Sequence, residues 1–326
     1  MDNKIMAIKP DTDRSRESSM RLNQIEIVVI GNIVKETIMR PDEVIGPVLG
    51  GPCAYTSLAL AKLGRNVGIV SYCSDDFWEK IREELLFVDD RGRISYMHTT
   101  ENHLIYQNEE KNHVEYFKVA PVITFDVIPE EYLQAEVFFI CPMDFEVSME
   151  VCRKLHDMGK KIIVDLGGYG GTTSYNHFSI DTNRGYKLIN DLCRYAHIIK
   201  ASCDDMHYIM PDMEVEKCTE YLIARGPKYA VITMGSQGAI YQEVGERAKL
   251  SNSYLNVDKK RNLTGAGDVF VAGMIAAMLE TEEESVEYMM DYGNSAASLV
   301  LQEKGGCQEK RMPTEQMVKL RMERKI

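Results

Sequence analysis

Short runs of apolar, often β-branched residues recur along the chain and alternate with stretches of helical periodicity. Each run is four to seven residues long, which is typical of a strand buried on both faces. Strands that alternate with helices form parallel sheets covered by helices, so the pattern predicts an α/β fold. The six runs are residues 25–31, 67–73, 136–142, 161–166, 197–200 and 229–235.

The clearest helix between two of these runs is predicted over residues 52–63. Ala54, Leu58 and Ala61 share one helical face, and Gly64 is placed to end the helix. A strand follows three residues later, as expected for a helix that connects two parallel strands.

Two stretches interrupt the alternation and predict a second, smaller sheet. Residues 103–107 and 113–118 flank a polar turn and read as an antiparallel hairpin. The segment 33–50 is also strand-like and ends in a double glycine. We expect these pieces, from about 33–50 and 95–120, to form a small β lid over one edge of the main sheet.

Length and charge narrow the class of protein. The 326 residues carry a formal charge of −12, which argues against nonspecific binding to nucleic acid or to anionic membranes. No apolar run reaches the roughly 18 residues of a membrane span. The eight cysteines contain no C-x-x-C pair and are expected to be free thiols in a reducing compartment. We expect a cytoplasmic protein with a poorly ordered extension over 1–22 and a folded domain over 23–326.

The strongest chemical signal is RNLTGAGDVFVAGMIAAM, residues 261–278. Its small residues recur at helical spacing, and two glycines stand where the helix begins. Glycines there let backbone N–H groups approach an anion, and the helix N-terminus adds positive potential. Asp268, in the first turn, could then take a proton from an attacking hydroxyl during phosphoryl transfer. A plain, tightly packed helix start explains the composition equally well.

Three ordered motifs give this segment its meaning. NLTGAGD resembles the D-T-x-G-A-G-D signature of the ribokinase (PfkB) family of sugar and nucleoside kinases. Residues 50–64 (GGPCAYTSLALAKLG) resemble the family's double glycine and following helix, and 231–241 (VITMGSQGAIY) its strand–turn–strand beside the nucleotide. The similarity covers residues 25–315. It implies a ribokinase-like three-layer α/β/α fold with a mainly parallel central sheet and a small β lid.

The resemblance also implies an activity and a set of roles. The activity is ATP-dependent phosphorylation of a hydroxyl on a sugar, cyclitol or related polyol, with Mg²⁺ as the partner of ATP. Asp268 would be the base, and the amides of Gly265, Ala266 and Gly267 the anion hole. The residues implied on the nucleotide side are Thr233, Gly235, Gly238, Asn294 and Ser202. Those implied on the acceptor side are Glu36, Gly50, Gly51 and Tyr55. Asn294 reads equally well as a polar position on a helix whose other face is core.

Several positions depart from the family pattern. Asn262 stands where the family has the first Asp of its signature, which weakens the support for a monovalent cation such as K⁺. The family's N-x-x-E reads Ser202 to Asp205, and Asp205 could still hold a metal-bound water. Glu36 and Tyr55 replace the usual acceptor-side Asp and Asn. The catalytic end is therefore retained and the acceptor end rewritten.

Alternative hypotheses follow from these departures. A nucleoside acceptor is the second choice, because Tyr55 offers an aromatic surface for a base. A catalytically weak relative that only binds ligand is favoured by the altered residues at 202, 205 and 262, and opposed by the intact GAGD segment. The ADP-dependent sugar kinases share a similar element but have much longer chains, so they rank last. The aromatic residues Tyr106, Tyr116 and Phe117 of the hairpin cover the substrate, pack the small sheet or form a homodimer contact through the lid.

Overall fold

The structure is a computed structural model, and it describes residues 24–106, 112–174, 182–254, 264–280, 285–302 and 305–324. The predicted extension over 1–22 and the departure at Asn262 lie outside the described residues.

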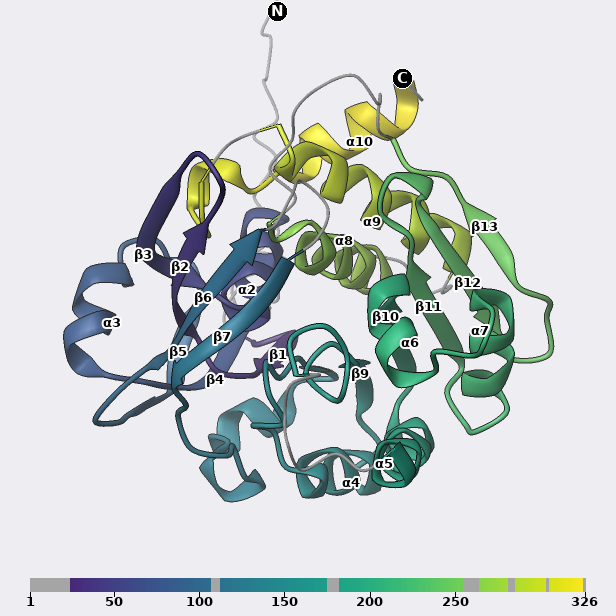
Figure 1. Cartoon of the computed structure of the whole chain (residues 1–326), viewed down its shortest axis with the longest axis horizontal. Coiled ribbons are helices and arrows are strands. Elements are labelled where there is room, and N and C mark those ends of the chain that lie inside the picture. The colour runs from purple at the N-terminus through teal and green to yellow at the C-terminus, as the bar shows by residue number, and fades with distance from the viewer. Residues whose placement is uncertain are drawn as a thin grey trace, which may run out of the picture.

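A nine-stranded sheet forms the centre of the protein, in the order β13-β12-β11-β10-β9-β8-β1-β4-β5 (Figure 1). Every neighbouring pair from β5 to β11 is parallel, whereas β12 and β13 are antiparallel additions at one edge. The strands are β1 (Ile27–Ile30), β4 (Val67–Cys73), β5 (Asp89–Ser95), β8 (Val137–Ile140), β9 (Lys161–Asp165), β10 (Ile198–Ser202), β11 (Tyr229–Thr233), β12 (Ala239–Glu243) and β13 (Lys249–Ser251). Each of the six predicted runs overlaps a strand of this sheet, so the predicted parallel sheet is confirmed.

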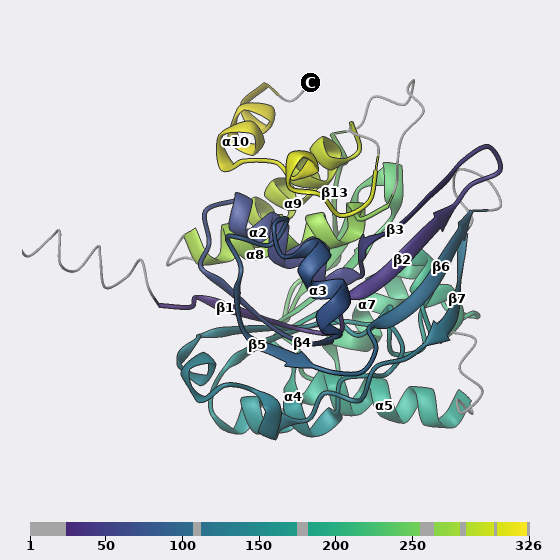
Figure 2. The same ribbon diagram turned by 90° about the vertical axis from the view of Figure 1, so that its left-hand side faces the viewer.

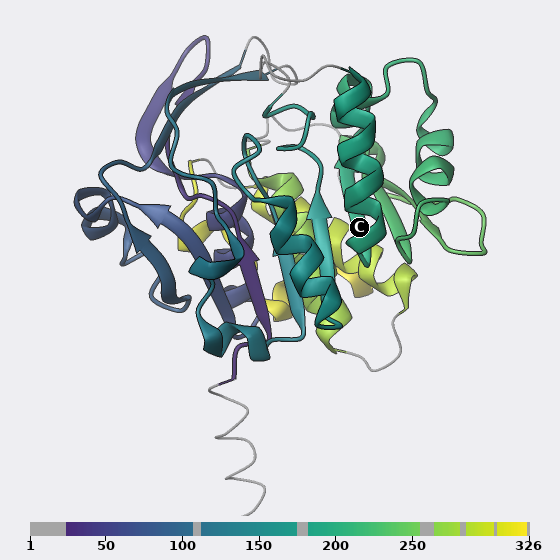
Figure 3. The same cartoon turned by 90° about the horizontal axis from the view of Figure 1, so that it is seen from below.

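Helices cover both faces of this sheet, which gives the three-layer architecture expected (Figure 2). One face carries α2 (Pro52–Lys62), α8 (Ala266–Glu280), α9 (Val286–Val300) and α10 (Glu315–Arg324). The other carries α4 (Met149–Asp157), α5 (Thr182–Tyr195), α6 (Cys203–Ile209) and α7 (Val215–Ile223), of which α4 and α5 lie in front of the sheet in Figure 3. The remaining elements are α3 (Asp75–Ile81) and the 3₁₀ turns η1 (Phe125–Val127), η2 (Glu130–Gln134), η3 (Gly235–Gln237) and η4 (Glu309–Arg311).

Helix α8 is buried along most of its length, and its composition explains why. Its central residues from Val269 to Met278 are all buried between the sheet and the neighbouring helices. At Gly273 an added Cβ would lie 2.9 Å from Cβ of Ala296 and 3.0 Å from Cα of Gly293, so small residues let α8 and α9 pack closely. This packing fixes the N-terminus of α8, where the GAGD segment lies.

The predicted small sheet is also present, in the order β3-β2-β6-β7. Its strands are β2 (Val34–Met39), β3 (Val44–Gly50), β6 (Thr100–Tyr106) and β7 (Asn112–Lys118), and β6 and β7 form the predicted antiparallel hairpin. Because β2 follows β1 after three residues, this sheet grows from the carboxyl edge of the central sheet (Figure 2). In parallel α/β sheets that edge is where ligands bind.

Strand β5 was not predicted from the sequence. Its residues, DDRGRIS, are mostly polar and carry none of the apolar runs that mark the other parallel strands. The structure supplies the reason: β5 lies at the end of the sheet, where one side of the strand is unpaired and polar residues are favoured.

Two further expectations are tested by the described residues. All eight cysteines are free thiols, and all but Cys203 are buried. No helix in the described part of the chain is long and apolar enough to cross a bilayer.

Candidate functional site

The GAGD segment forms the start of α8, and its first glycine is required twice over. Gly265 has a φ of +83°, a conformation that residues with a side chain rarely adopt. An added Cβ there would lie only 2.3 Å from Cε1 of Tyr55. Glycine therefore lets the loop turn into the helix while resting directly on the Tyr55 ring. Ala266 is then the first residue of α8, so the amides of this loop stand at a helix N-terminus, where an anion is favoured.

Asp268 is the third residue of α8, and its carboxyl group is half-buried beside other charges. Its backbone carbonyl accepts a hydrogen bond from Oγ1 of Thr56 in α2 at 3.2 Å, which ties the first turn of α8 to its neighbour. Burial raises the pKa of Asp268 to about 7, Lys200 opposes the rise, and Asp165 and Asp205 add to it. A carboxyl group with this pKa is suited to general base catalysis near neutral pH.

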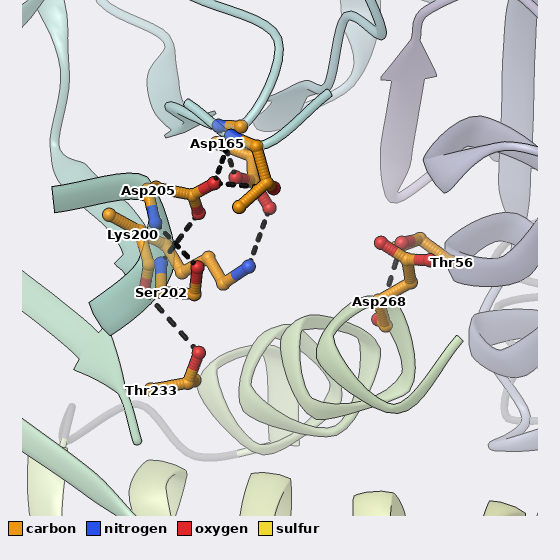
Figure 4. A network of polar contacts seen from close by, with 10 residues as sticks. Thr56, Asp165, Lys200, Ser202, Asp205, Thr233 and Asp268 are labelled. Atoms are coloured by element: carbon orange, nitrogen blue, oxygen red, sulfur yellow. Dashed lines mark hydrogen bonds and ion pairs between the residues drawn. The ribbon is translucent and has the colours of Figure 1, made fainter. Parts of the chain in front are cut away.

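Lys200 in β10 is the cation whose charge acts on the Asp268 carboxyl group. Its Nζ lies 2.8 Å from Oδ2 of Asp165, and both side chains are less than a tenth exposed. An added Cβ at Gly267 would lie 3.6 Å from the same Nζ, so the ammonium stands beside the GAGD loop (Figure 4). Burial lowers the pKa of Lys200, but Asp165, Asp205 and Asp268 outweigh it and hold the pKa above its ordinary value.

Sequence reasoning missed Lys200, although a signal was present. It is the one charged residue inside the apolar run 197–200, and a lysine within a buried strand requires a compensating partner. That partner, Asp165, ends the neighbouring strand β9, and the two residues are directly paired in the sheet.

Ser202 and Asp205 form a capping box at the start of α6. Oγ of Ser202 accepts from the amide of Asp205 at 3.0 Å, and Oδ2 of Asp205 accepts from the amide of Ser202 at 2.7 Å. Oδ1 of Asp205 accepts from the amide and the hydroxyl of Thr172 at 2.8 and 2.7 Å. Local donors thus hold both carboxylate oxygens, which fits Asp205 to an outer contact through water better than to direct metal ligation. No cluster of three His, Cys, Asp or Glu side chains suited to a metal occurs among the described residues.

A pocket of about 570 Å³ lies between the β11–β12 turn and β13. It is lined by Glu216, Met234, Ser236, Gln237, Ile240, Leu250, Asn252 and Ser253. The predicted nucleotide residues Thr233, Gly235 and Gly238 do not line the pocket themselves. They are adjacent in sequence to the lining residues Met234, Ser236 and Gln237. Gly235 and Gly238 have φ values of +57° and +94° and shape the turn, and a Cβ at Gly238 would lie 2.1 Å from the carbonyl oxygen of Ser251.

Asn294 braces the rim of the same pocket. Its Nδ2 donates to Oγ of Ser251 at 2.9 Å and lies 3.4 Å from the Ser251 carbonyl oxygen. The side chain is buried, and Ser251 immediately precedes the lining residues Asn252 and Ser253. The polar side chain on α9 therefore supports the pocket wall.

The acceptor side contains buried polar groups without partners. Glu36 and Asn102 are 4% and 0% exposed and are paired across β2 and β6. Oε2 of Glu36 and both polar atoms of the Asn102 amide have no hydrogen-bond partner among the described residues. Burial and the charge on Asp268 together raise the pKa of Glu36 to about 7, and Asn102 opposes the rise, so the carboxyl groups of Glu36 and Asp268 lie in the same region. Gly50 leaves space for Glu36, since a Cβ there would lie 2.9 Å from Oε2.

The other two predicted acceptor residues have structural contacts of their own. Gly51 has a φ of +85° and caps α2, and a Cβ there would lie 2.8 Å from Cγ2 of Val34. Tyr55 is 2% exposed, packs its ring on Gly265 and receives a hydrogen bond from Arg311 at 3.4 Å. Its ring supports the GAGD loop from below, so a direct stacking surface for a base, which the sequence suggested, is not what the structure shows at Tyr55.

The small sheet contacts the same loop. The hydroxyl of Tyr106 at the end of β6 lies 2.7 Å from Oγ1 of Thr264, the residue before Gly265. Arg40 also reaches Oγ1 of Thr264, at 3.4 Å, and lies over the Tyr106 ring. Phe117, by contrast, is 57% exposed, and its ring packs against the ring of His103.

Three comparisons place this geometry among known proteins. The model of the pfkB family of carbohydrate kinases matches residues 173–314, which contain Lys200, the pocket and the GAGD segment. The cytidine kinase of Thermococcus kodakarensis is 25% identical over 255 residues, covering 77% of this chain and 88% of the relative.

Solved structures share the fold. A pyrophosphate-dependent kinase of the ribokinase family, bound to a pyrophosphate analogue and myo-inositol, superposes with a TM-score of 0.72 at 14% identity, covering 87% of this chain and 98% of the other. A putative ribokinase II of E. coli, in complex with ATP and Mg²⁺, gives 0.70 at 18% identity, covering 92% and 99%. Together with the three ordered motifs and the three-layer fold, these matches support a kinase of the PfkB, or ribokinase, family.

Proposed function

We propose that the protein transfers the γ-phosphoryl group of ATP to a hydroxyl of a small polyol, with Asp268 as the general base. The observation that carries this proposal is the environment of Asp268: a carboxyl group in the first turn of a helix, with its pKa raised to about 7, that interacts electrostatically with both the Lys200 ammonium and the buried Glu36. Base, cation and an acceptor-side carboxyl group are thus coupled to one another.

In the proposed reaction, Asp268 accepts the proton of the acceptor hydroxyl as its oxygen attacks the γ-phosphorus. The bond from that phosphorus to the bridging oxygen breaks, and ADP leaves with the bond's electron pair. The amides of Gly265, Ala266 and Gly267 and the Lys200 ammonium would stabilise the charge on the transferring group. Each of these groups is held in place before substrate binds, Lys200 by Asp165 and the loop by Tyr55.

Magnesium would arrive with the nucleotide. The residues present fit this arrangement, since Mg²⁺ bound to phosphates keeps several waters and needs few protein ligands. Asp205, whose oxygens already accept three hydrogen bonds, would hold one of those waters. The ion would offset phosphate charge. The adenine would occupy the pocket between Met234 and Leu250, where Asn294 supports the wall.

A polyol is the acceptor class best supported by the acceptor side. Glu36 offers an acceptor atom, and Asn102 offers one acceptor and two donor hydrogens, all buried and unpartnered. Neighbouring hydroxyls of a sugar or cyclitol satisfy such groups together, and the structural neighbour that holds myo-inositol is consistent with this class. A nucleoside is the second candidate, because the relative from Thermococcus is a cytidine kinase.

The test is consumption of ATP with Mg²⁺ across sugars, inositols and nucleosides, repeated with ADP and pyrophosphate as donors. We expect turnover with ATP on a polyol. Turnover with pyrophosphate alone would refute the donor assignment, and turnover on nucleosides alone would refute the acceptor class. A chain that gains thermal stability with ATP but turns over no acceptor would be the binding-only relative.

Activity is expected to rise with pH through about 7. Asp268 must be ionised to accept a proton, and its pKa is about 7, so kcat/KM should fall nearly tenfold per pH unit below that value. Because Glu36 also titrates near 7, the midpoint belongs to the pair of carboxyl groups rather than to one of them. A pH profile of kcat/KM between 5 and 9 checks this, and a flat profile would contradict the role of Asp268.

Replacing Glu36 with glutamine is expected to weaken acceptor binding more than turnover. Loss of a charged hydrogen-bond partner should raise the acceptor KM by roughly 10- to 100-fold, with a smaller change in kcat. The matched control is Glu101→Gln. Glu101 precedes Asn102 in β6, and its carboxylate pairs with Lys35 and Lys118. Equal effects of the two substitutions on KM would argue against a contact between Glu36 and the acceptor.

Three finer expectations stay predictions. We propose a cytoplasmic protein in which the small sheet acts as a lid over the acceptor and forms a homodimer contact. Phe117 and Val44 are exposed large apolar side chains of that sheet, which is the property a dimer contact needs. Measurement of the mass in solution, with Phe117→Ser as the comparison, tests the contact.

A further inference from the structure

A buried guanidinium holds the loop that leads into the GAGD segment. Arg311, at the end of η4, is only 2% exposed and donates to four backbone carbonyl oxygens. Nη1 lies 2.8 and 2.7 Å from the oxygens of Gly305 and Gly306, and Nη2 lies 3.2 and 3.3 Å from those of Thr264 and Val300. These four carbonyls come from three separate segments of the chain.

The carbonyl set resembles a cation site in its chemistry. Backbone carbonyl oxygens that converge on one point replace the water shell of a monovalent cation, as in potassium-selective pores. A guanidinium provides the same positive charge with five N–H donors in a fixed plane, and it remains charged at any pH of interest. Arg311 therefore supplies from the chain itself the charge that this group of carbonyls requires.

The position of these carbonyls connects Arg311 to the proposed reaction. Thr264 directly precedes Gly265, whose amide belongs to the proposed anion hole. The hydroxyl of Tyr55 lies 3.4 Å from Nη1 of Arg311, and the Tyr55 ring supports Gly265. On the other side, the amide of Cys307 donates to the carbonyl of Leu49 at 3.1 Å, next to Gly50. Arg311 thus links the anion-hole loop to segment 305–307, and the backbone of that segment bonds to the acceptor-side strand β3.

We infer that Arg311 is a built-in cation that positions the anion-hole loop, so that turnover needs no added monovalent cation. The inference rests on the proposed function of the GAGD loop. Arg311 donates to backbone carbonyls that shape the loop and to Tyr55, so we assign it the role of a positioning residue. Its loss should change the rate of the chemical step more than the affinity for ATP, because the loop amides matter most in the transition state.

The experiment compares three proteins: the wild type, Arg311→Ala and Arg311→Lys. Wild-type turnover should be the same in K⁺, Na⁺ and the bulky tetramethylammonium ion at matched ionic strength. Arg311→Ala should lose about 100-fold in kcat, the effect of a displacement near 1 Å, with the KM for ATP changed much less. Low millimolar guanidinium or K⁺ should restore at least part of that loss, and tetramethylammonium should not. Arg311→Lys, which keeps the charge but not the fork, should lie between the two.

The control is Arg225→Ala. This arginine also donates to a backbone carbonyl, that of Tyr221 at 2.6 Å, but it lies outside the site. We expect neither a loss of kcat nor rescue. Wild-type dependence on K⁺ would overturn the inference, as would an Arg311→Ala protein that matches the control or that no small cation restores. If Arg311→Ala does not fold, the same comparison made with Arg311→Lys and the wild-type cation series decides.

Failure of the proposed function would look different, because the wild type would then show no turnover in any salt. The unfolding temperature still tests the inference in that case. Guanidinium or K⁺ at low millimolar concentration should raise the unfolding temperature of Arg311→Ala and not that of Arg225→Ala or the wild type, since only the first has an unfilled cation site. An equal response of all three proteins would overturn it.

Discussion

Replacement of Asp268 by asparagine should lower kcat by about 10²- to 10⁴-fold while leaving ATP affinity nearly unchanged. The amide keeps the shape of the carboxyl group but cannot accept the hydroxyl proton. Its position in the first turn of α8, tied to Thr56 through the backbone, is preserved by the substitution. Steady-state kinetics and a thermal-shift titration with ATP and Mg²⁺ measure the two quantities separately.

A matched control accounts for the loss of a negative charge in the first turn of a helix. Asp76→Asn also exchanges an aspartate for its amide in the first turn of a helix, but on the exposed side of α3. It should leave kcat unchanged. Turnover by Asp268→Asn at the level of Asp76→Asn would show that another group takes the proton.

Asp268→Asn should also raise the free energy of unfolding at high pH. The folded-state pKa of Asp268 is raised to about 7 from 3.8, so the folded protein holds this proton more tightly than the unfolded chain. The penalty for ionising the carboxyl group in the fold is therefore absent below about pH 4, grows as pH rises and is complete above 7. Its upper limit is about 4 kcal/mol, and the partial exposure of the side chain reduces it to about 1–2 kcal/mol. Denaturant unfolding of Asp268→Asn and wild type should thus differ at pH 8 and agree near pH 4.

Replacement of Lys200 by methionine should damage both stability and activity. It leaves Asp165 buried without its charge partner, and breaking a buried ion pair costs about 3–5 kcal/mol. It also removes the cation beside Gly267, and loss of one such electrostatic contact costs about 10²- to 10³-fold in kcat. Denaturant unfolding and kinetics on the folded fraction give the two effects.

A second substitution separates the two roles of Lys200. Asp165→Asn together with Lys200→Met removes both charges and should recover most of the lost stability, because no unpaired charge is then buried. Activity should stay low, since the cation is still missing from the phosphoryl side. Recovery of activity along with stability would mean that Lys200 only holds the fold together.

Much of the fold could be predicted because its strands are buried on both faces. Short apolar runs that alternate with helical stretches favour strands in the interior of a parallel sheet, so the pattern located β1, β4, β8, β9, β10 and β11. The edge strand β5 lacks this constraint on one side, and its polar sequence gave no signal.

The site was only partly predictable, for a related reason. GAGD is a local motif, and its place at the start of α8 follows from its own glycines. Lys200 and Arg311 act through partners far away in sequence, Asp165 and the carbonyls of Thr264 and Val300, which only the fold brings together. The contact between Tyr55 and Gly265 was not predicted either. A sequence shows that an aromatic ring is present but does not show which residues cover its faces.

That contact between Tyr55 and Gly265 constrains how this enzyme can diverge. Any side chain at position 265 would clash with the Tyr55 ring. Any smaller residue at position 55 would remove the side chain against which the loop packs. The two positions should therefore change together or not at all among descendants of this chain. Glu36 and Asn102 are less constrained, because Oε2 of Glu36 and both polar atoms of the Asn102 amide have no hydrogen-bond partner among the described residues. We therefore expect substitutions that change the acceptor to accumulate at Glu36 and Asn102, on β2 and β6, and not at Tyr55 and Gly265.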